Sequence, residues 1–184
     1  MKLTVLDSFQ GDLDSLKEKV LNFRHTYPNE TQFLITSEDG KNYLMGAGTE
    51  AEPEKFTVCN EHFCDTEVAN LVNRYPEYYR WRILCIRPKV TYSIHHDGWR
   101  NGYRNVRLHV PIVTNPDSYL VFYDRLMEKA QGDVPYAGQQ TIKYYQPKPG
   151  FVYEADTTDY HTAVNYHGTD ERIHIVAERF VPNE

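Results

Sequence analysis

The stretch that decides the fold is RWRILCIRPKVTYSIHHD, which runs from Arg80 to Asp97. Apolar and polar residues alternate within two short runs, and Pro88 stands between them. Alternation of this kind, bounded by turn residues, is typical of half-buried β-strands. The stretch therefore predicts two strands, at residues 80–86 and 90–96.

The same rhythm continues to the end of the chain. Short alternating runs are separated by Pro, Gly, Asn and Asp, which favour turns. Further candidate strands lie at residues 106–113, 119–123, 141–145, 151–155, 161–166 and 173–181. Eight short strands are the number found in a double-sheet jelly roll. We therefore expect a mainly β (α+β) fold with a double-stranded β-helix, or cupin-like jelly roll, at residues 79–184.

The first 78 residues have a different pattern. Apolar residues recur at helical spacing in residues 12–23, where Asp12 or Asp14 is a candidate cap, and again in 66–75, which Pro76 ends. We expect an α/β portion, residues 1–78, whose helices pack on the major sheet within a single domain, 1–184. Other expected elements are a strand at 3–9, an apolar run at 32–36, a loop at 49–60 and a surface excursion at 125–140.

The composition limits the class of protein. The 184 residues are 40% hydrophobic and 25% charged, with a net charge of −6, which argues against nucleic-acid or anionic-membrane partners. No apolar run approaches the roughly 20 residues of a membrane span, and the first residues do not resemble a signal peptide. Three cysteines provide no disulfide framework. We expect a soluble, cytoplasmic protein, and a bacterial or viral source.

Six arginines gather in two short segments, at residues 80–87 and 100–107. Each segment could form a local basic patch, but we expect most of these arginines on the solvated face of strands. They are Arg80, Arg82, Arg87, Arg100, Arg104 and Arg107.

The candidate chemistry begins with a His-x-Asp pair. Side chains two apart on a strand point to the same face, so His95 and Asp97 converge while His96 points away. His161, after a turn-prone segment, is the best third ligand. Two histidines and one carboxylate leave three coordination positions open, which is typical of non-haem Fe(II) oxygenases. The co-substrate 2-oxoglutarate would take two of these positions and O₂ the third.

A cation must bind the far carboxylate of 2-oxoglutarate. Arg172 follows His161 by 11 residues, at the start of the last predicted strand. Its planar guanidinium pairs with a carboxylate bidentately and stays charged. We expect it deep in the barrel, opposite the metal.

Four blocks of sequence resemble the aspartyl/asparaginyl β-hydroxylase family. They are residues 88–97 (PKVTYSIHHD), 107–115 (RLHVPIVTN), 150–165 (GFVYE through HTAVN) and 172–176 (RIHIV), in the family's order. The resemblance covers about residues 80 to 180 and implies a double-stranded β-helix that binds Fe(II) and 2-oxoglutarate. It implies oxidative decarboxylation coupled to C–H hydroxylation.

The resemblance also implies roles for individual residues. His95, Asp97 and His161 would bind iron and Arg172 the co-substrate. His109 and Arg107 would face the cavity, touching the co-substrate or an acidic group of the substrate. Leu84 stands where some relatives have a hydroxyl that assists co-substrate binding, so Tyr92 or Ser93 is a candidate replacement.

Two other functions remain open at this stage. A cupin-type metal enzyme has a similar site but does not use 2-oxoglutarate, and a non-catalytic jelly-roll module binds a partner without metal. The substrate also stays open among a peptidyl Asp, Asn or Pro side chain, a free amino acid and a lipid acyl chain. Residues 117–140, where substrate loops are expected, match no pattern.

Overall fold

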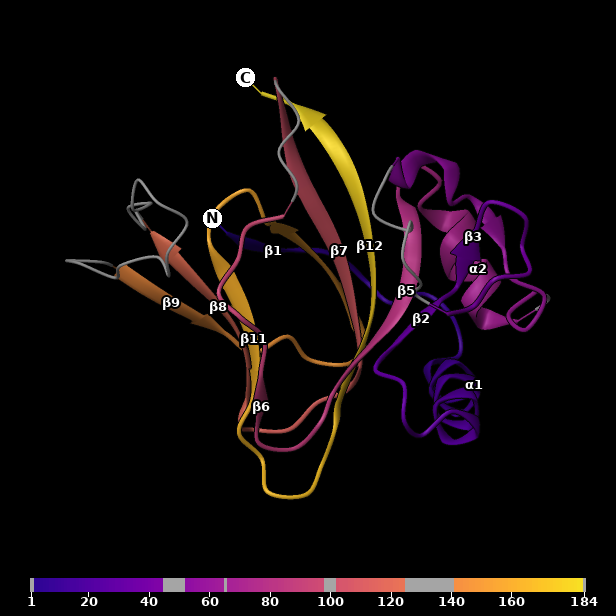
Figure 1. Ribbon diagram of the computed structural model, residues 1–184, viewed down its shortest axis with the longest axis horizontal. Coiled ribbons are helices and arrows are strands. Elements are labelled where there is room, and N and C mark those ends of the chain that lie inside the picture. Colours follow the sequence, from indigo (N-terminus) through magenta and orange to yellow (C-terminus); the bar gives the residue numbers. More distant parts are fainter. Residues whose placement is uncertain (1, 45–51, 65, 98–101, 125–140, 184) are drawn as a thin grey trace.

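Two antiparallel sheets face each other in the computed structural model, which describes residues 2–44, 52–64, 66–97, 102–124 and 141–183. The larger sheet has six strands in the order β1-β10-β7-β12-β5-β2, and the smaller has four in the order β6-β11-β8-β9. In Figure 1 the smaller sheet lies on the left and the helices on the right, with the larger sheet between them. The strands of the larger sheet are β1 (Leu3–Ser8), β2 (Gln32–Leu34), β5 (Tyr79–Ile86), β7 (Tyr103–Val113), β10 (Phe151–Asp156) and β12 (Arg172–Pro182). Those of the smaller sheet are β6 (Val90–Thr91), β8 (Ser118–Asp124), β9 (Thr141–Tyr145) and β11 (His161–Asn165).

The order of the strands confirms the double-stranded β-helix. From β5 onward the chain passes back and forth between the sheets, so β5-β12-β7-β10 faces β6-β11-β8-β9. Strands β1 and β2 extend the larger sheet at its two edges, where β1 pairs with β10 and β2 with β5. The N-terminal residues thus contribute strands as well as helices to the larger sheet. A further pair, β3 (Thr36–Ser37) with β4 (Val58–Cys59), and the short 3₁₀ helix η1 (Pro53–Lys55) lie outside these two sheets.

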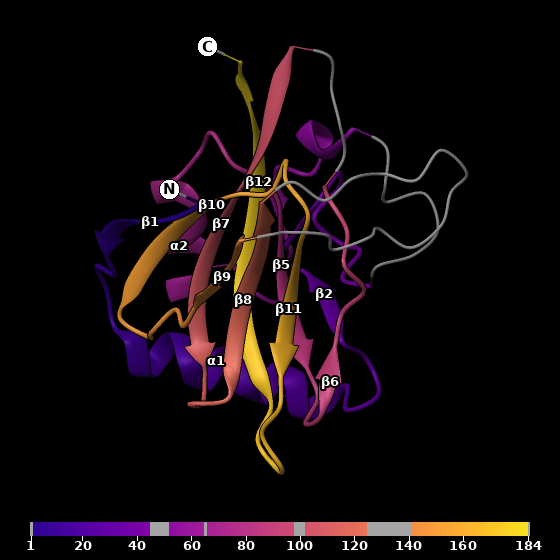
Figure 2. The ribbon, with the colours of Figure 1, turned by 90° about the vertical axis from the view of Figure 1, so that its left-hand side faces the viewer.

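The two helices cover the outer face of the larger sheet, as Figure 2 shows from a second direction. They are α1 (Leu13–Thr26) and α2 (Glu67–Arg74). Asp12 caps α1 by accepting hydrogen bonds from the backbone N–H groups of residues 14 and 15, and Thr66 caps α2. One core cluster joins the helices to the sheet and includes Leu16, Val20, Leu71, Trp81, Ile83, Leu108 and Ile175. The expected packing of helices on the major sheet is confirmed.

No helix in the described part of the chain is long and apolar enough to cross a membrane.

Alternation along the strands separates the two faces of the larger sheet. On β12, Ile173 and Ile175 belong to the core beneath the helices. Arg172 and Glu178, an even number of residues apart, line the cavity between the sheets instead. Strand β7 follows the same rule, with Leu108 beneath the helices. The interior between the sheets is therefore polar on one wall, and this polar wall carries the candidate site.

Two sequence predictions about this region are wrong in part. The strand expected at 90–96 is regular only over Val90–Thr91, and the rest is joined to β11 by an isolated bridge between His95 and His161. The arginines of β5 and β7 do not lie mainly on solvated faces, as described below. The excursion expected at 125–140 lies outside the described residues.

Candidate active site

One extra residue in the segment after β6 directs the side chain of His95 toward the cavity. Tyr92 donates its backbone N–H to Ala163 of β11 (3.1 Å), which in a regular ladder would place residue 94 opposite His161. Instead His95 stands there, with paired backbone hydrogen bonds of 3.0 and 2.7 Å to His161. The segment thus has one more residue than β11 opposite it, as in a β-bulge. Tyr92 and His95, which would face opposite sides of a regular strand, both line the cavity.

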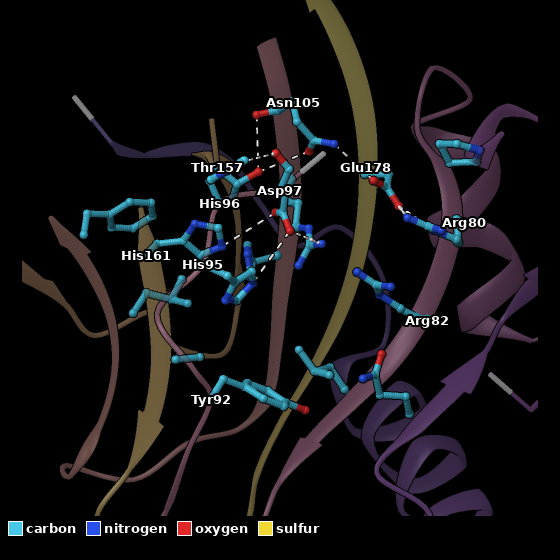
Figure 3. Close-up of a pocket in the computed structure, with 18 of the residues that line it drawn as sticks. Arg80, Arg82, Tyr92, His95, His96, Asp97, Asn105, Thr157, His161 and Glu178 are labelled. Atoms are coloured by element: carbon cyan, nitrogen blue, oxygen red, sulfur yellow. Dashed lines mark hydrogen bonds and ion pairs between the residues drawn. The ribbon is translucent and has the colours of Figure 1, made fainter. Parts of the chain in front are cut away.

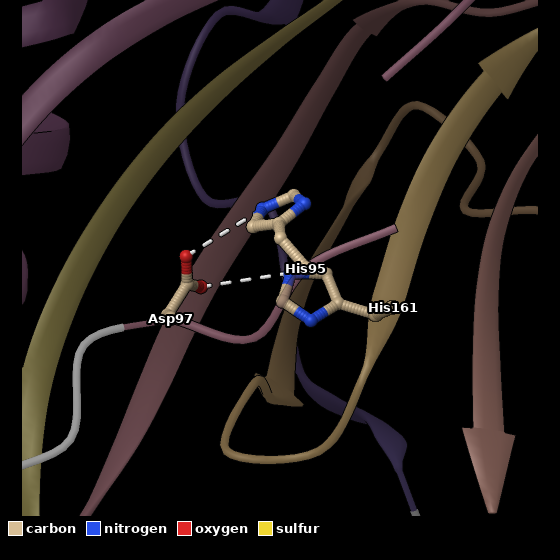
Figure 4. A group of neighbouring side chains, drawn as sticks. All are labelled: His95, Asp97 and His161. Atoms are coloured by element: carbon tan, nitrogen blue, oxygen red, sulfur yellow. Dashed lines mark ion pairs between the residues drawn. The ribbon is translucent and has the colours of Figure 1, made fainter. Parts of the chain in front are cut away.

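Three potential metal ligands meet at this bulge. The Nε2 atom of His95 lies 3.7 Å from Oδ1 of Asp97, and Nε2 of His161 lies 3.6 Å from Oδ2. One ligand atom from each residue lies within 4.8 Å of the others. Figure 4 shows the two rings converging on the carboxylate. The structure therefore brings the three predicted ligands together, although the segment is not a regular strand.

Backbone contacts fix both rings in the form that suits a metal. Nδ1 of His95 lies 2.8 Å from the carbonyl oxygen of Ser93, and Nδ1 of His161 lies 2.9 Å from that of Asp159. A carbonyl oxygen only accepts, so each Nδ1 carries the hydrogen and each Nε2 presents a lone pair to the site. Orientation of this kind is characteristic of metal-binding histidines.

The carboxylate of Asp97 is buried and held ionised. Burial raises its pKa, but the guanidinium of Arg107, 2.5 Å from Oδ1, and the other polar neighbours outweigh that effect, and the pKa falls below its ordinary value. Oδ2 is buried without a hydrogen-bond partner among the described residues. A buried anionic oxygen with no donor is costly unless a cation binds it. This oxygen and the two Nε2 lone pairs together fit a divalent metal ion.

Burial keeps His161 neutral. It lowers the pKa of the imidazole to about 3, against the opposing effect of Asp97. The Phe122 ring stacks on the imidazole, with ring centroids 5.6 Å apart. A neutral, positioned imidazole is the form that binds a metal.

The three residues lie at the wall of a cavity of about 610 Å³ between the two sheets (Figure 3). Arg172 lines it with only 1% of its surface exposed, and its Nη2 donates to Nδ1 of His174 (3.2 Å). Burial lowers the pKa of Arg172 to about 10, so it remains charged at neutral pH. It has no carboxylate partner among the described residues. Its expected place in the interior is thus observed.

The other predicted residues also reach the cavity. Arg107 and His109 line it from β7 and Leu84 from β5 of the same sheet, whereas Tyr92 and Ser93 line it from the segment after β6. Burial, followed by repulsion from Arg172 and Arg107, holds the pKa of His109 well below its ordinary value. His109 is therefore a neutral polar group in the wall, in ring contact with His174 at 5.8 Å.

Sequence reasoning missed the polar residues of β5 and the far end of β12. Arg82 is buried and lines the cavity, and Arg80 forms an ion pair of 2.5 Å with the buried Glu178. Of the group expected on solvated faces, Arg87 is exposed. The signal was present in the run Trp81-Arg82-Ile83-Leu84, because a strand that is apolar on both faces has no solvated side for its arginines.

A double-stranded β-helix with a His-x-Asp pair and a distant histidine at one cavity has the architecture and donor set of a non-haem metal oxygenase. Solved structures share the fold. AviO1 from Streptomyces viridochromogenes superposes with a TM-score of 0.57 at 14% identity, over 98% of this chain and 89% of that one. SnoN, a non-haem α-ketoglutarate-dependent epimerase from nogalamycin biosynthesis, gives 0.56 at 13% identity, over 98% and 78%.

HygX from Streptomyces hygroscopicus, whose structure contains nickel and 2-oxoglutarate, gives a TM-score of 0.55 at 10% identity, over 99% of this chain and 83% of that one. No family model matches the sequence, and no curated protein matches it significantly. At these identities the likeness establishes the fold. It does not extend to the aspartyl/asparaginyl β-hydroxylase family.

Proposed function

We propose that this protein is an oxygenase that depends on Fe(II) and 2-oxoglutarate. The observation that carries the proposal is the pair of fixed imidazoles whose Nε2 atoms face the buried carboxylate of Asp97 at 3.6 and 3.7 Å. The buried, carboxylate-free Arg172 in the same cavity supplies a place for the co-substrate. Support also comes from the shared fold, since SnoN is α-ketoglutarate-dependent and HygX holds 2-oxoglutarate.

In this proposal His95, Asp97 and His161 hold the iron. Bound Fe(II), with 2-oxoglutarate and O₂, supplies the oxidising power for attack on a C–H bond. Arg172 pairs with the distal carboxylate of the co-substrate and so orients it. Arg107 holds Asp97 in place and keeps it ionised. Leu120, Phe122 and Ala163 line the cavity beside His161 and shield it from water.

For the reaction, we propose hydroxylation of the aspartyl/asparaginyl β-hydroxylase kind. The four sequence blocks that resemble that family support it. The substrate is an Asp, Asn or Pro side chain of a peptide, or a free amino acid. A small-molecule substrate agrees with SnoN, which has been solved in complex with Fe³⁺, α-ketoglutarate and nogalamycin RO.

An anaerobic absorption experiment tests the proposal. Fe(II) and then 2-oxoglutarate are added to metal-free protein, and the visible spectrum is recorded. Bidentate chelation of the keto acid to iron gives a charge-transfer band, which we expect in the wild type. The band should be absent in His161→Ala and should need more 2-oxoglutarate in Arg172→Gln.

Two other outcomes would contradict the proposal. Tight Fe(II) binding without a band points to a cupin-type metal enzyme that does not use the keto acid. No metal binding by the folded wild type points to a non-catalytic binding module. Thermal melting of each variant checks that it is folded.

A further inference from the structure

The cavity holds more positive than negative charge. Its described lining includes four arginines and two carboxylates, namely Arg80, Arg82, Arg107 and Arg172 with Asp97 and Glu178. Arg80 pairs with Glu178, and Arg107 pairs with Asp97, each at 2.5 Å. Under the proposed function, Arg172 receives the distal carboxylate of 2-oxoglutarate. Among the four arginines of the described lining, Arg82 is then the cation that has no anionic partner.

Arg82 is a buried arginine whose guanidinium lacks the hydrogen-bond and ion-pair partners that buried arginines usually have. Only 7% of its surface is exposed, and its Nε has no hydrogen-bond partner. Among the residues that the structure describes, no hydrogen bond or ion pair reaches its guanidinium. The nearby Glu178 is already engaged, since Oε1 accepts from Arg80 and Oε2 from Nδ2 of Asn105 at 3.2 Å. Glu178 and Asp97 attract Arg82 without direct contact, and Arg80 and Arg107 already pair with them. A buried ion without a directly paired counter-ion is destabilising, so a bound anion would be favoured here.

The position of Arg82 directs it toward the reaction site. It lies on β5 between Trp81 and Ile83, which face the helices, so its own side chain faces the cavity. Figure 3 shows its guanidinium pointing to the side of the cavity where Asp97 lies. Burial and the neighbouring Arg107 lower the pKa of Arg82 to about 10, and it remains a cation at neutral pH.

A second donor stands on the neighbouring strand. Gln32 of β2 pairs in register with Leu84, two residues beyond Arg82 on β5. Its half-buried side chain lines the same cavity, and its amide has no partner within the described parts of the chain. One guanidinium and one amide on adjacent strands match the two oxygens and single charge of a carboxylate.

We propose that Arg82 and Gln32 form the anchor for a carboxylate of the substrate, which makes the substrate class a small carboxylic acid. This inference rests on the proposed function, which assigns Arg172 to the co-substrate. It also assigns to Arg82 the contact with an acidic substrate group that the family resemblance implied for Arg107, because Arg107 is engaged with Asp97.

The first arm of the test needs neither iron nor turnover. Binding of benzoate, its uncharged counterpart benzamide and inorganic phosphate is measured by calorimetry on metal-free Arg172→Gln protein, in which Arg82 is the remaining candidate. We expect one benzoate site, at least tenfold tighter for benzoate than for benzamide or phosphate. In this Arg172→Gln background, Arg82→Gln should weaken the affinity for benzoate at least tenfold and Gln32→Leu several-fold. Arg82→Lys should retain part of that affinity.

A matched control is Arg74→Gln, since Arg74 is a half-exposed arginine paired with Asp7 outside the cavity. It should leave benzoate binding unchanged. Thermal melting identifies any variant that does not fold, and Gln32→Leu then carries the test. The proposal would be overturned by equal affinity for benzoate and benzamide, or by the absence of benzoate binding. It would also be overturned if benzoate bound with undiminished affinity when Arg82 and Gln32 were both replaced. Tighter phosphate binding would overturn the carboxylate assignment.

The second arm separates this proposal from the proposed function. Benzoate is added anaerobically to wild-type protein loaded with Fe(II) and 2-oxoglutarate. We expect it to bind without displacing the co-substrate, so the charge-transfer band persists. Loss of the band through competition would assign Arg82 to the co-substrate and overturn the inference. If no band forms at all while the first arm succeeds, the oxygenase function fails but the carboxylate anchor stands.

Discussion

Arg107 and Asp97 form an ion pair in which Nη2 lies 2.5 Å from Oδ1, while the other carboxylate oxygen faces Nε2 of His161. The two residues come from different segments, since Arg107 is on β7 and Asp97 follows the bulge after β6. One carboxylate is thus divided between a supporting cation and the candidate metal position. Arg107 thereby fixes where the free oxygen points.

Replacing Arg107 with Gln should weaken metal binding about 10- to 100-fold, the usual cost of losing a residue that orients a ligand. The loss should be larger at pH 6 than at pH 7.5. Without Arg107, the pKa of the buried Asp97 rises, and protons compete with the metal as the pH falls. Titration with Co(II), followed by its absorption, measures the affinity at both pH values. Arg107→Lys should keep part of it, and an unchanged affinity with an unchanged pH dependence would show that Arg107 has no such role.

The neighbouring histidines 95 and 96 provide a matched pair. His95 presents its Nε2 to Asp97, whereas His96 is exposed, donates from Nδ1 to the carbonyl oxygen of Asp97 (3.2 Å) and packs on Tyr160. We expect His95→Gln to reduce Fe(II) affinity by more than about 100-fold, beyond the cost of losing a supporting residue. His96→Gln should change it by less than about threefold. Equilibrium dialysis of both variants tests this, and equal losses would show that the bulge does not select the ligand.

Three buried neutral histidines make stability depend on pH. Burial lowers the pKa of His161 to about 3 and holds those of His109 and His174 well below the ordinary value. As the pH falls through about 6.5, the unfolded chain binds a proton at each of these positions and the folded chain does not. Stability is therefore greatest above pH 6.5 and falls below it. We expect the metal-free protein to lose about 4 kcal/mol of unfolding free energy between pH 7.5 and pH 5.5.

Urea unfolding at the two pH values measures this loss. In His174→Asn, the loss of unfolding free energy should shrink by about 1.4 kcal/mol, which is the share of one histidine. The amide oxygen of this variant can still accept the hydrogen bond from Arg172. The exposed His25 provides the control, since His25→Asn should leave the loss as it is in the wild type. A loss that does not shrink in His174→Asn would contradict the assignment of a buried neutral histidine.

The sequence predicted those features that depend on residue spacing. Period-two alternation identified the eight strands of the β-helix, and the order of His95, Asp97, His161 and Arg172 identified the candidate site. The strands follow from short-range geometry, since a strand's faces alternate whatever its neighbours are. The cap of α1 belongs to the same class of local signals, since Asp12, one of the two candidates, caps the helix. The site follows from residue types, since two histidines and one carboxylate are a known donor set.

Features that depend on pairing between distant strands were not predictable. The bulge before His95 exists only relative to β11, so no run of residues reveals it. Arg82 is a different case, because the apolar residues around it indicate a strand with no solvated face: helices cover one side of β5 and the cavity the other. The pairing of Arg80 with Glu178 joins residues 98 positions apart in the chain.

Asn165 belongs to one of the sequence blocks that resemble an enzyme family, yet its contacts are structural. It is fully buried at the end of β11, and its Nδ2 donates to the carbonyl oxygens of Ile86, Arg87 and Asp170 at 2.8 to 3.3 Å. Its Oδ1 accepts from Asn115 and Ser118. One amide thus joins the ends of β5, β8 and β11 and the turn before β12.

Asn165→Asp should destabilise the protein by about 3 kcal/mol or more, because a carboxylate oxygen replaces the donor and faces three buried carbonyl oxygens. Asn42 is exposed, and among the described residues its side chain only accepts a hydrogen bond from a backbone N–H, so Asn42→Asp makes the same chemical change at a cost below about 0.5 kcal/mol. His161 lies at the opposite end of β11, about 13 Å away at 3.3 Å per residue. Folded Asn165→Asp protein should therefore bind metal as the wild type does. Urea unfolding and Co(II) titration of the two variants separate these effects. Loss of metal affinity without loss of stability would instead assign Asn165 to the active site.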